Sequence, residues 1–151
     1  MTLTPVLDPT PPSTFSALAR ELAQFRYRLR LFLRFSEQAA RAVGVTPLQH
    51  QLMLGAAGFT GQGRATISEL AECLQMRHNA VVALVGRAAR AGLVQKRRPT
   101  GDRRIVRVEV TARGRRILHV LTRVHRRELA RFRSELAPIL ARNARRTRVV
   151  R

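Results

Sequence analysis

The sequence has few of the residues from which reactive centres are built. It contains one cysteine, no tryptophan and four histidines in 151 residues. The single cysteine, Cys73, permits no intramolecular disulfide, and the dispersed histidines make no metal-ligand spacing. The P-loop, the dinucleotide-binding glycine motif and the G-x-S-x-G motif are all missing. These absences argue against an enzyme, and we expect neither a metal nor another cofactor.

Long hydrophobic runs are also missing. No apolar stretch is long enough to span a bilayer, and no secretory signal pattern occurs. We therefore expect a cytoplasmic protein. The hydrophobic content of 45% nevertheless argues for a folded chain, and a length of 151 residues is most simply one domain.

Acidic residues are scarce beside basic ones. Nine Asp and Glu face 29 Lys and Arg, which gives a formal net charge of +20. A polyanion most simply offsets such self-repulsion, so nucleic acid is favoured as the partner and an anionic membrane surface comes second. Every basic residue except Lys96 is arginine, so part of the excess can reflect the codon usage of the genome. The position of the charges is therefore more informative than their sum.

The N-terminal part of the chain predicts an arm followed by a long helix. Four of the seven prolines fall within residues 1–14, which we expect to form a flexible arm. Residues 15–45 predict a helix ended by Gly44, because apolar residues recur at steps of three and four. This apolar stripe is longer than a small core requires, so part of it is predicted to face a second subunit, with intrachain packing as the alternative. Its members are Phe15, Leu18, Leu22, Phe25, Leu29, Phe32 and Phe35.

Two capping boxes mark the starts of the next two helices. Thr46 is followed by Gln49, and Thr66 by Glu69, a spacing that satisfies free backbone amides at a helix start. Between these helices, residues 58–64 are too rich in glycine for a regular element and predict a loop. The second helix contains Cys73, for which we expect ordinary packing rather than redox sensing.

The helix predicted for residues 78–90 has two different faces. One is apolar, and the other is narrow and rich in hydrogen-bond donors, as a helix that reads base edges in the major groove must be. An ordinary solvated face is the alternative. The apolar face consists of Val81, Leu84, Val85 and Ala88, and the candidate reading face consists of Arg77, His78, Asn79, Val82, Ala83 and Arg87.

A hairpin is predicted to follow this helix. Residues 93–97 and 105–110 predict two strands, joined by a loop that contains proline and glycine. Arginine on a slim loop suits a narrow minor groove. Helix, turn, helix and hairpin in this order predict a winged helix-turn-helix module over residues 46–110, in a fold that is mainly α with a small β-hairpin wing. The candidate DNA-binding residues of the wing are Arg97, Arg98, Asp102, Arg103 and Arg104.

The C-terminal part predicts a second long helix. Thr111 is its expected N-cap, and an apolar stripe runs from Ile117 to Ile139. Pro138 predicts a kink or the start of a separate short helix. The arginine-rich tail of residues 142–151 predicts either a frayed helix or a tail that contacts phosphates.

Three motifs between residues 66 and 114 are shared with one known family. They are the helix Ile67-Ser-Glu-Leu-Ala-Glu72, the segment from Val81 to Arg87 followed by Gly92-Leu93-Val94, and Asp102-x-Arg104 leading to Val110-Thr111-x-x-Gly114. With them, residues 15–139 resemble the multiple-antibiotic-resistance regulator (MarR) family of bacterial transcription factors. The chain departs from the family at Gly86, where an acidic or amide residue is common. It also lacks a cysteine near the start of the first long helix, so oxidant sensing is not expected.

The resemblance implies a homodimer in which residues 15–45 and 111–151 form a dimerisation lobe. It further implies that Arg104 enters the minor groove, that Asp102 orients the wing, and that residues 77–87 read the major groove. The candidate interface residues are Phe15, Leu18, Leu22, Leu121, Phe132 and Leu136.

Many proteins of this family bind small aromatic or phenolic acids between the lobe and the winged module, which weakens DNA binding. The residues of this chain that could line such a cleft are Tyr27, Arg30, Arg34, His50 and Met53, and core packing or solvated charge is the alternative for each.

The leading hypothesis is a homodimeric, sequence-specific transcriptional repressor that binds a pseudo-palindromic operator and that a small aromatic effector can release. The competing hypothesis is a non-specific nucleoid-type or RNA-binding protein that exploits the net charge.

Overall fold

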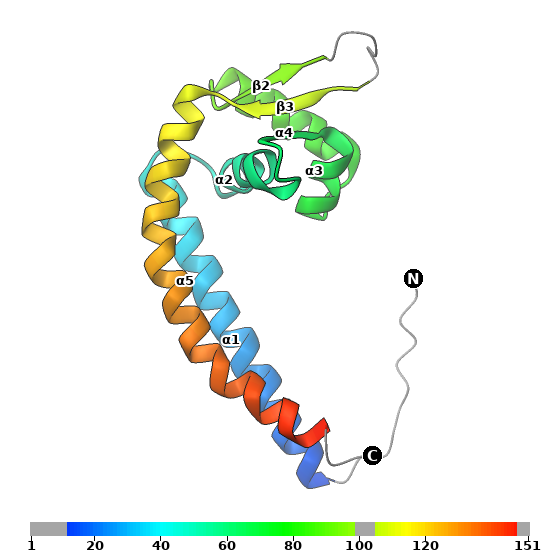
Figure 1. Ribbon diagram of the computed structural model, residues 1–151, viewed down its shortest axis with the longest axis vertical. Coiled ribbons are helices and arrows are strands. Elements are labelled where there is room, and N and C mark those ends of the chain that lie inside the picture. Colours follow the sequence, from blue (N-terminus) through cyan, green and yellow to red (C-terminus); the bar gives the residue numbers. More distant parts are fainter. Residues whose placement is uncertain (1–11, 99–104, 148–151) are drawn as a thin grey trace. The chain divides into compact units, whose positions relative to one another are not determined.

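The computed structural model describes residues 12–98 and 105–147 and is mainly helical (Figure 1). The predicted arm up to residue 11, the wing loop of residues 99–104 and the last residues, 148–151, lie outside the described part. Within the described part, no helix has both the length and the apolar character needed to cross a membrane. The elements in chain order are α1 (Pro12–Ala42), α2 (Pro47–Leu54), the π-helix η1 (Gly55–Phe59), β1 (Arg64–Thr66), α3 (Ile67–Leu74), α4 (His78–Arg90), β2 (Val94–Arg97), β3 (Arg107–Val110) and α5 (Ala112–Thr147).

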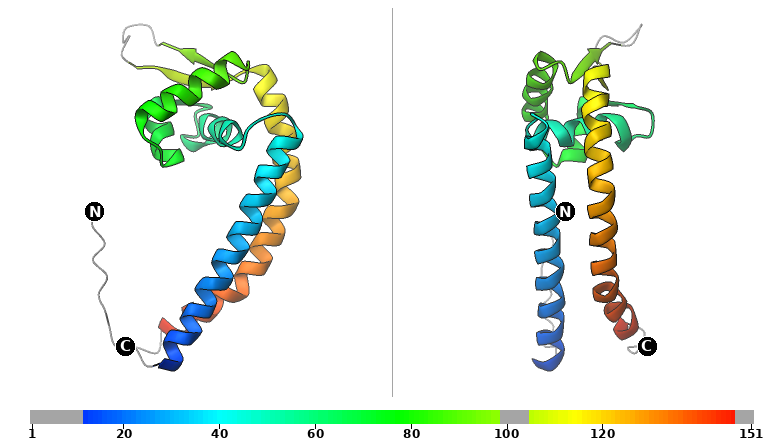
Figure 2. Two further views of the ribbon diagram at one scale, coloured as in Figure 1. Left: turned by 180° about the vertical axis from the view of Figure 1, so that it is seen from behind. Right: turned by 90° about the vertical axis from the view of Figure 1, so that its left-hand side faces the viewer.

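The chain divides into two compact units, each containing part of both long helices. We call residues 12–33 with 128–147 the helical unit, and residues 34–127 the winged unit. In the helical unit, α1 and α5 run side by side (Figures 1 and 2). The rings of Phe32 and Phe132 pack between the two helices with their centroids 5.1 Å apart. Aromatic packing therefore joins α1 to α5.

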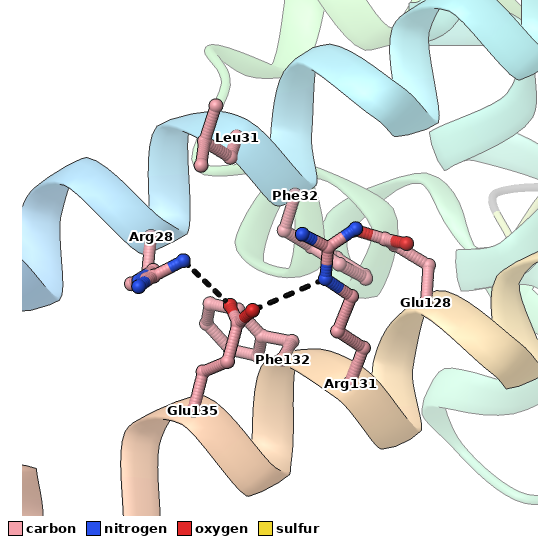
Figure 3. Close-up of a pocket in the computed structure, with 7 residues that line it drawn as sticks. All are labelled: Arg28, Leu31, Phe32, Glu128, Arg131, Phe132 and Glu135. Atoms are coloured by element: carbon pink, nitrogen blue, oxygen red, sulfur yellow. Dashed lines mark hydrogen bonds and ion pairs between the residues drawn. The ribbon is translucent and has the colours of Figure 1, made fainter.

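A shared carboxylate adds a polar link between the same two helices. Arg28 of α1 donates to Glu135 of α5 at 3.0 Å, and Nε of Arg131 donates to the other oxygen of this carboxylate at 3.1 Å. Figure 3 shows both guanidinium groups directed at Glu135. The side chains are partly exposed, so the link contributes little to stability.

The winged unit contains the main hydrophobic core. Its sheet has the strand order β1-β3-β2, and both pairs are antiparallel. The registers pair Ala65 with Val108 and Val94 with Val110, so that these four apolar side chains are buried together. The helices cover them with further fully buried side chains, which include Leu52, Met53, Leu70, Leu84 and Leu121.

Threonine side chains cap the N-termini of three helices, as predicted. Thr46 accepts the amide of Gln49 at 3.2 Å, and Thr66 accepts the amide of Glu69 at the same distance. In return, the backbone amide of each threonine donates to the side chain of its partner, to Gln49 at 2.9 Å and to Glu69 at 2.7 Å. Thr111 accepts the amide three residues along α5 at 3.0 Å. Both capping boxes and the N-cap of α5 are thereby confirmed.

The first helix starts earlier than the sequence predicts. α1 begins at Pro12, inside the segment predicted as an arm. Proline fits the first turn of a helix because the N–H that it lacks has no partner there, and its φ is already helical. The predicted end is confirmed: Gly44, with φ +80°, closes α1 in the left-handed conformation.

The glycine-rich segment after α2 is more regular than predicted. The π-helix η1 extends α2 as far as Phe59, and Arg64 already belongs to β1, so only residues 60–63 form the predicted loop. β1 adds a third strand to the predicted hairpin. Pro138 lies inside α5, which continues through it to Thr147 rather than restarting.

α5 begins in direct contact with the sheet. The amide of Thr111 donates to the carbonyl of Leu93 at 3.0 Å, and its hydroxyl donates to the carbonyl of Gly92 at 2.6 Å. In the same turn, a Cβ on Gly114 would overlap the carbonyl oxygen of Leu93 and lie 2.7 Å from Cγ1 of Val110. The close approach of α5 to the strand therefore requires glycine at this position.

Candidate nucleic-acid interface

The apolar face of α4 anchors this helix in the winged unit. Val81, Leu84, Val85 and Ala88 are buried, as the sequence predicts. Side chains three and four residues apart share one face of a helix, so the opposite face is left to solvent. The burial pattern thus presents the candidate reading face outward.

The outward face of α4 is narrow and rich in donors. Ala83 and Gly86 add little bulk to it, and the six predicted residues are exposed: Arg77, His78, Asn79, Val82, Ala83 and Arg87. The prediction omitted Arg90, which is exposed and shares a face with Asn79, Ala83 and Gly86 by its spacing of four and three residues. Its Nη1 lies 3.8 Å from the position that a Cβ on Gly86 would occupy, so this guanidinium extends over the glycine. The helical spacing alone could have identified it.

The N-terminus of α4 differs from those of α2, α3 and α5. The other three starts have a threonine hydroxyl bonded to a backbone amide, whereas in the described part of the chain no side chain caps α4, whose N-cap residue is Arg77. Free amides at a helix start, together with the positive end of the helix dipole, attract anions. The start of α4 therefore lacks the side-chain cap of the other helices. The amide of Ala80, which corresponds to those that threonine binds elsewhere, donates to the carbonyl of Arg77 at 3.0 Å.

Arg87 lies beside the start of α2. It lines a surface pocket together with Thr46, Pro47, Leu48, Gln49 and Leu84. The α2 capping box and the guanidinium thus come together at one side of the reading face.

The strands place two further arginines at the base of the wing. Arg97 ends β2 and pairs with Glu109 of β3 at 3.5 Å, while Arg98 follows it and is exposed. The side chain of Gln95 also donates to Glu109, at 3.2 Å. The remaining predicted wing residues, Asp102, Arg103 and Arg104, lie outside the described residues.

The predicted effector residues are divided between the two units. Tyr27 and Arg30 are exposed on the helical unit, where the guanidinium of Arg28 lies 5.8 Å from the centroid of the Tyr27 ring. Arg34, which is exposed, belongs to the winged unit with His50 and Met53. His50 and Met53 are buried in its interior.

The structure brings two histidines together that the sequence analysis treated as dispersed. The rings of His50 and His125 lie 5.0 Å apart between centroids. Nδ1 of His125 is 2.7 Å from the carbonyl oxygen of Leu121 and must therefore carry the hydrogen, while Nε2 lies 2.8 Å from the hydroxyl of Ser36. Burial, reinforced by the charge of His125, lowers the pKa of His50 to about 4. His50 is therefore neutral at physiological pH.

Some of the predicted interface residues pack within the chain itself. Leu121 and Leu136 are buried, and Phe132 is half-buried against its aromatic partner, so these three are already covered by their own chain. Leu18 and Leu22 are 43% and 59% exposed and remain available to a second subunit. The side chain of Phe15 lies outside the described residues.

Cys73 is half-buried in α3, and its Sγ lies 3.2 Å from the position that a Cβ on Gly55 would occupy. Burial raises the pKa of its thiol. The reactive form of cysteine is the thiolate, so these surroundings favour packing over redox chemistry.

Comparison with known proteins agrees with this arrangement. Residues 43–105 match a family model described as MarR family. A search of curated proteins found no match to the chain.

Several solved structures share the fold. AbsC, a MarR family transcriptional regulator from Streptomyces coelicolor, is 19% identical with a TM-score of 0.63, and the match covers 96% of this chain and 99% of that one. A mutant MarR from E. coli, complexed with operator DNA, is 17% identical with a TM-score of 0.64, covering 91% and 98% of the two chains. NadR in complex with 4-hydroxyphenylacetate is 17% identical with a TM-score of 0.59, covering 97% and 96%. These likenesses show the fold, and the family model covers the winged helix within it. The chain therefore has the fold of MarR family structures, and its residues 43–105 match the MarR family model.

Proposed function

We propose that the protein is a homodimeric regulator that recognises a pseudo-palindromic operator with α4 and represses transcription there. The observation that carries this proposal is the outward face of α4, which is narrow, rich in donors and uncapped at its start. Asn79 and Arg87 are side chains of the kinds that bind base edges in the major groove, and Arg77 is suited to a phosphate. The fold shared with the operator-bound MarR mutant supports this role.

The wing supplies the second contact in this proposal. Arg104 enters the flanking minor groove, whose negative potential attracts guanidinium, and Asp102 orients the loop. Arg97, Arg98 and Arg103 contact phosphates. The exposure of the first two at the end of β2 supports this placement.

A second copy of the chain completes the proposed DNA-binding dimer. Leu18 and Leu22 expose apolar area on α1 that a partner subunit would cover. Two-fold symmetry then places two half-sites about one helical turn apart, roughly 34 to 36 Å. Repression follows if the bound dimer excludes the transcription machinery from its operator.

Competition between DNA molecules tests the proposal. A labelled operator duplex is titrated with protein in the presence of a large excess of random duplex at fixed salt. A sequence-specific regulator keeps its operator, because specific sites bind about 10³-fold or more tighter than non-specific DNA. Displacement in proportion to the competitor would instead favour the nucleoid-type or RNA-binding alternative, in which the charge of +20 alone drives binding.

We also propose that a small aromatic or phenolic acid weakens operator binding, as the complex of NadR with 4-hydroxyphenylacetate suggests for a protein of this fold. The exposed guanidinium group of Arg34 suits a carboxylate. Titration of the operator complex with aromatic carboxylates tests this: release should be lost in Arg34→Gln, and release that persists there would remove Arg34 from the site.

A further inference from the structure

The first turns of α5 carry a cluster of positive charge. Residues 112–127 contain six arginines, two histidines and no acidic residue. This segment belongs to the winged unit, and its inner face is held there by buried Leu121 and Gly114. The arginines therefore occupy a helix whose position relative to α4 is set by the core.

Three of these arginines form one line on the outer face of the helix. Arg116, Arg123 and Arg127 are seven and four residues apart, which places them within about 40° of one another around the axis. All three are exposed, and they span about 16 Å along α5. His119 and Arg126 flank the line and are exposed as well. We call these five residues the α5 stripe.

No carboxylate neutralises the α5 stripe among the residues that the structure describes. The ion pairs there involve Glu37, Glu109 and Glu135, whose partners are other arginines. The neighbouring Arg115 differs, because it donates to the carbonyl of Val110 at 2.7 Å. The stripe thus exposes guanidinium groups that no structural contact of the described chain requires.

We propose that the α5 stripe binds the phosphate backbone of double-stranded DNA, as a contact surface separate from α4 and the wing. A line of guanidinium groups about 16 Å long matches a backbone that carries one charge every 3.4 Å per strand. At its upper end, Arg116 and His119 line a shallow surface hollow with Ala112, Arg115 and Val120, which gives a backbone ridge a place to lie. The contact does not depend on which sequence α4 reads.

An anionic membrane fits this surface less well. A helix that lies on a membrane needs a broad apolar face to enter the lipid, with the charged residues opposite. The apolar face of this segment is occupied by the core, since Leu121 is 1% exposed. Within residues 112–127, the large apolar side chains that are exposed are Val120 and Val124, at 48% and 43%. Duplex DNA is therefore the favoured partner.

The test measures how salt weakens binding to a duplex of random sequence. The variant replaces Arg116, Arg123 and Arg127 by glutamine, which keeps helix propensity and removes three charges. A control variant replaces Arg20, Arg26 and Arg133, which are exposed arginines of the helical unit. Each neutralised phosphate contributes about 0.9 to the slope of log K against log salt, so the stripe variant should lose about 2.7 per chain and the control less than about 1. Circular dichroism spectra confirm that both variants are folded.

Three results would overturn the proposal. An unchanged slope in the stripe variant would remove the surface from DNA binding. An equal loss in both variants would assign the effect to overall charge. If the stripe variant no longer bound phosphatidylglycerol vesicles but kept its salt slope on DNA, the stripe would be assigned to lipid binding. Because the duplex is random, the outcome is independent of whether α4 recognises an operator, which the competition assay tests.

Discussion

Substitution of Gly114 by alanine tests how α5 is joined to the sheet. The added methyl group would overlap the carbonyl oxygen of Leu93 and lie 2.7 Å from Cγ1 of Val110. The first obstacle is backbone, so no change of side-chain rotamer relieves it, and the first turn of α5 has to move. That movement breaks the two bonds that Thr111 donates to the carbonyls of Leu93 and Gly92.

The expected loss of stability follows from these contacts. Each of the two hydrogen bonds contributes about 1 kcal/mol net, and overpacking costs about 1 to 3 kcal/mol. Gly114→Ala should therefore lower the free energy of unfolding by about 3 to 5 kcal/mol, a large share of the roughly 5 to 15 kcal/mol typical of a folded domain.

Urea unfolding followed by circular dichroism measures this loss, with protein concentration held constant. The matched control is Gly86→Ala in α4, where the nearest atom outside the helix backbone is Nη1 of Arg90 at 3.8 Å. Alanine favours a helix interior by about 1 kcal/mol over glycine, so this variant should be as stable as the parent or slightly more stable. A Gly114→Ala protein within about 0.5 kcal/mol of the parent would refute the close approach of α5 to the strand.

Four further predictions concern stability and DNA binding. The pKa of His50 is lowered from its ordinary value of 6.5 to about 4, so neutral His50 contributes to stability above pH 6.5, and up to about 3 kcal/mol of this is lost as the pH falls towards 4. In His50→Leu the free energy of unfolding should therefore depend less on pH, and a pH profile like that of the parent would contradict this. Thr66→Ala removes the hydroxyl that accepts the amide of Glu69 and should lower the urea midpoint by the equivalent of about 1 kcal/mol, whereas Ser should largely restore it. Asn79→Ala should cost about 1 to 3 kcal/mol on operator DNA and little on random DNA, whereas Arg104→Ala should weaken operator binding without changing the unfolding midpoint; equal losses on both DNAs would assign Asn79 to a phosphate contact.

The parts of the fold that the sequence predicts well are those specified by nearby residues. A capping box needs only two residues three positions apart, so the starts of α2 and α3 are readable without any tertiary information. The left-handed Gly44 and the buried side of α4 are equally local, because they follow from conformational freedom and helical period. The outward face of α4 could be predicted for the same reason, and Arg90 could have been included.

The parts that were missed depend on residues far apart in the chain. β1 is three residues long and becomes a strand only by pairing with β3, more than 40 residues later. His50 and His125 are similarly distant, so their contact cannot be read from either sequence segment. The burial of Leu121 within its own chain is another such case, because an apolar stripe on a helix does not specify which surface covers it.

Selection of bound duplexes from a random DNA pool tests the central claim most directly. The protein is incubated with the pool at a fixed salt concentration, and the retained sequences are compared with the starting ones. The account predicts an inverted repeat whose half-sites are about one helical turn apart, because two copies of α4 read one face of the duplex. Retained sequences with no enriched motif would contradict it and would leave charge alone to explain how this protein binds DNA.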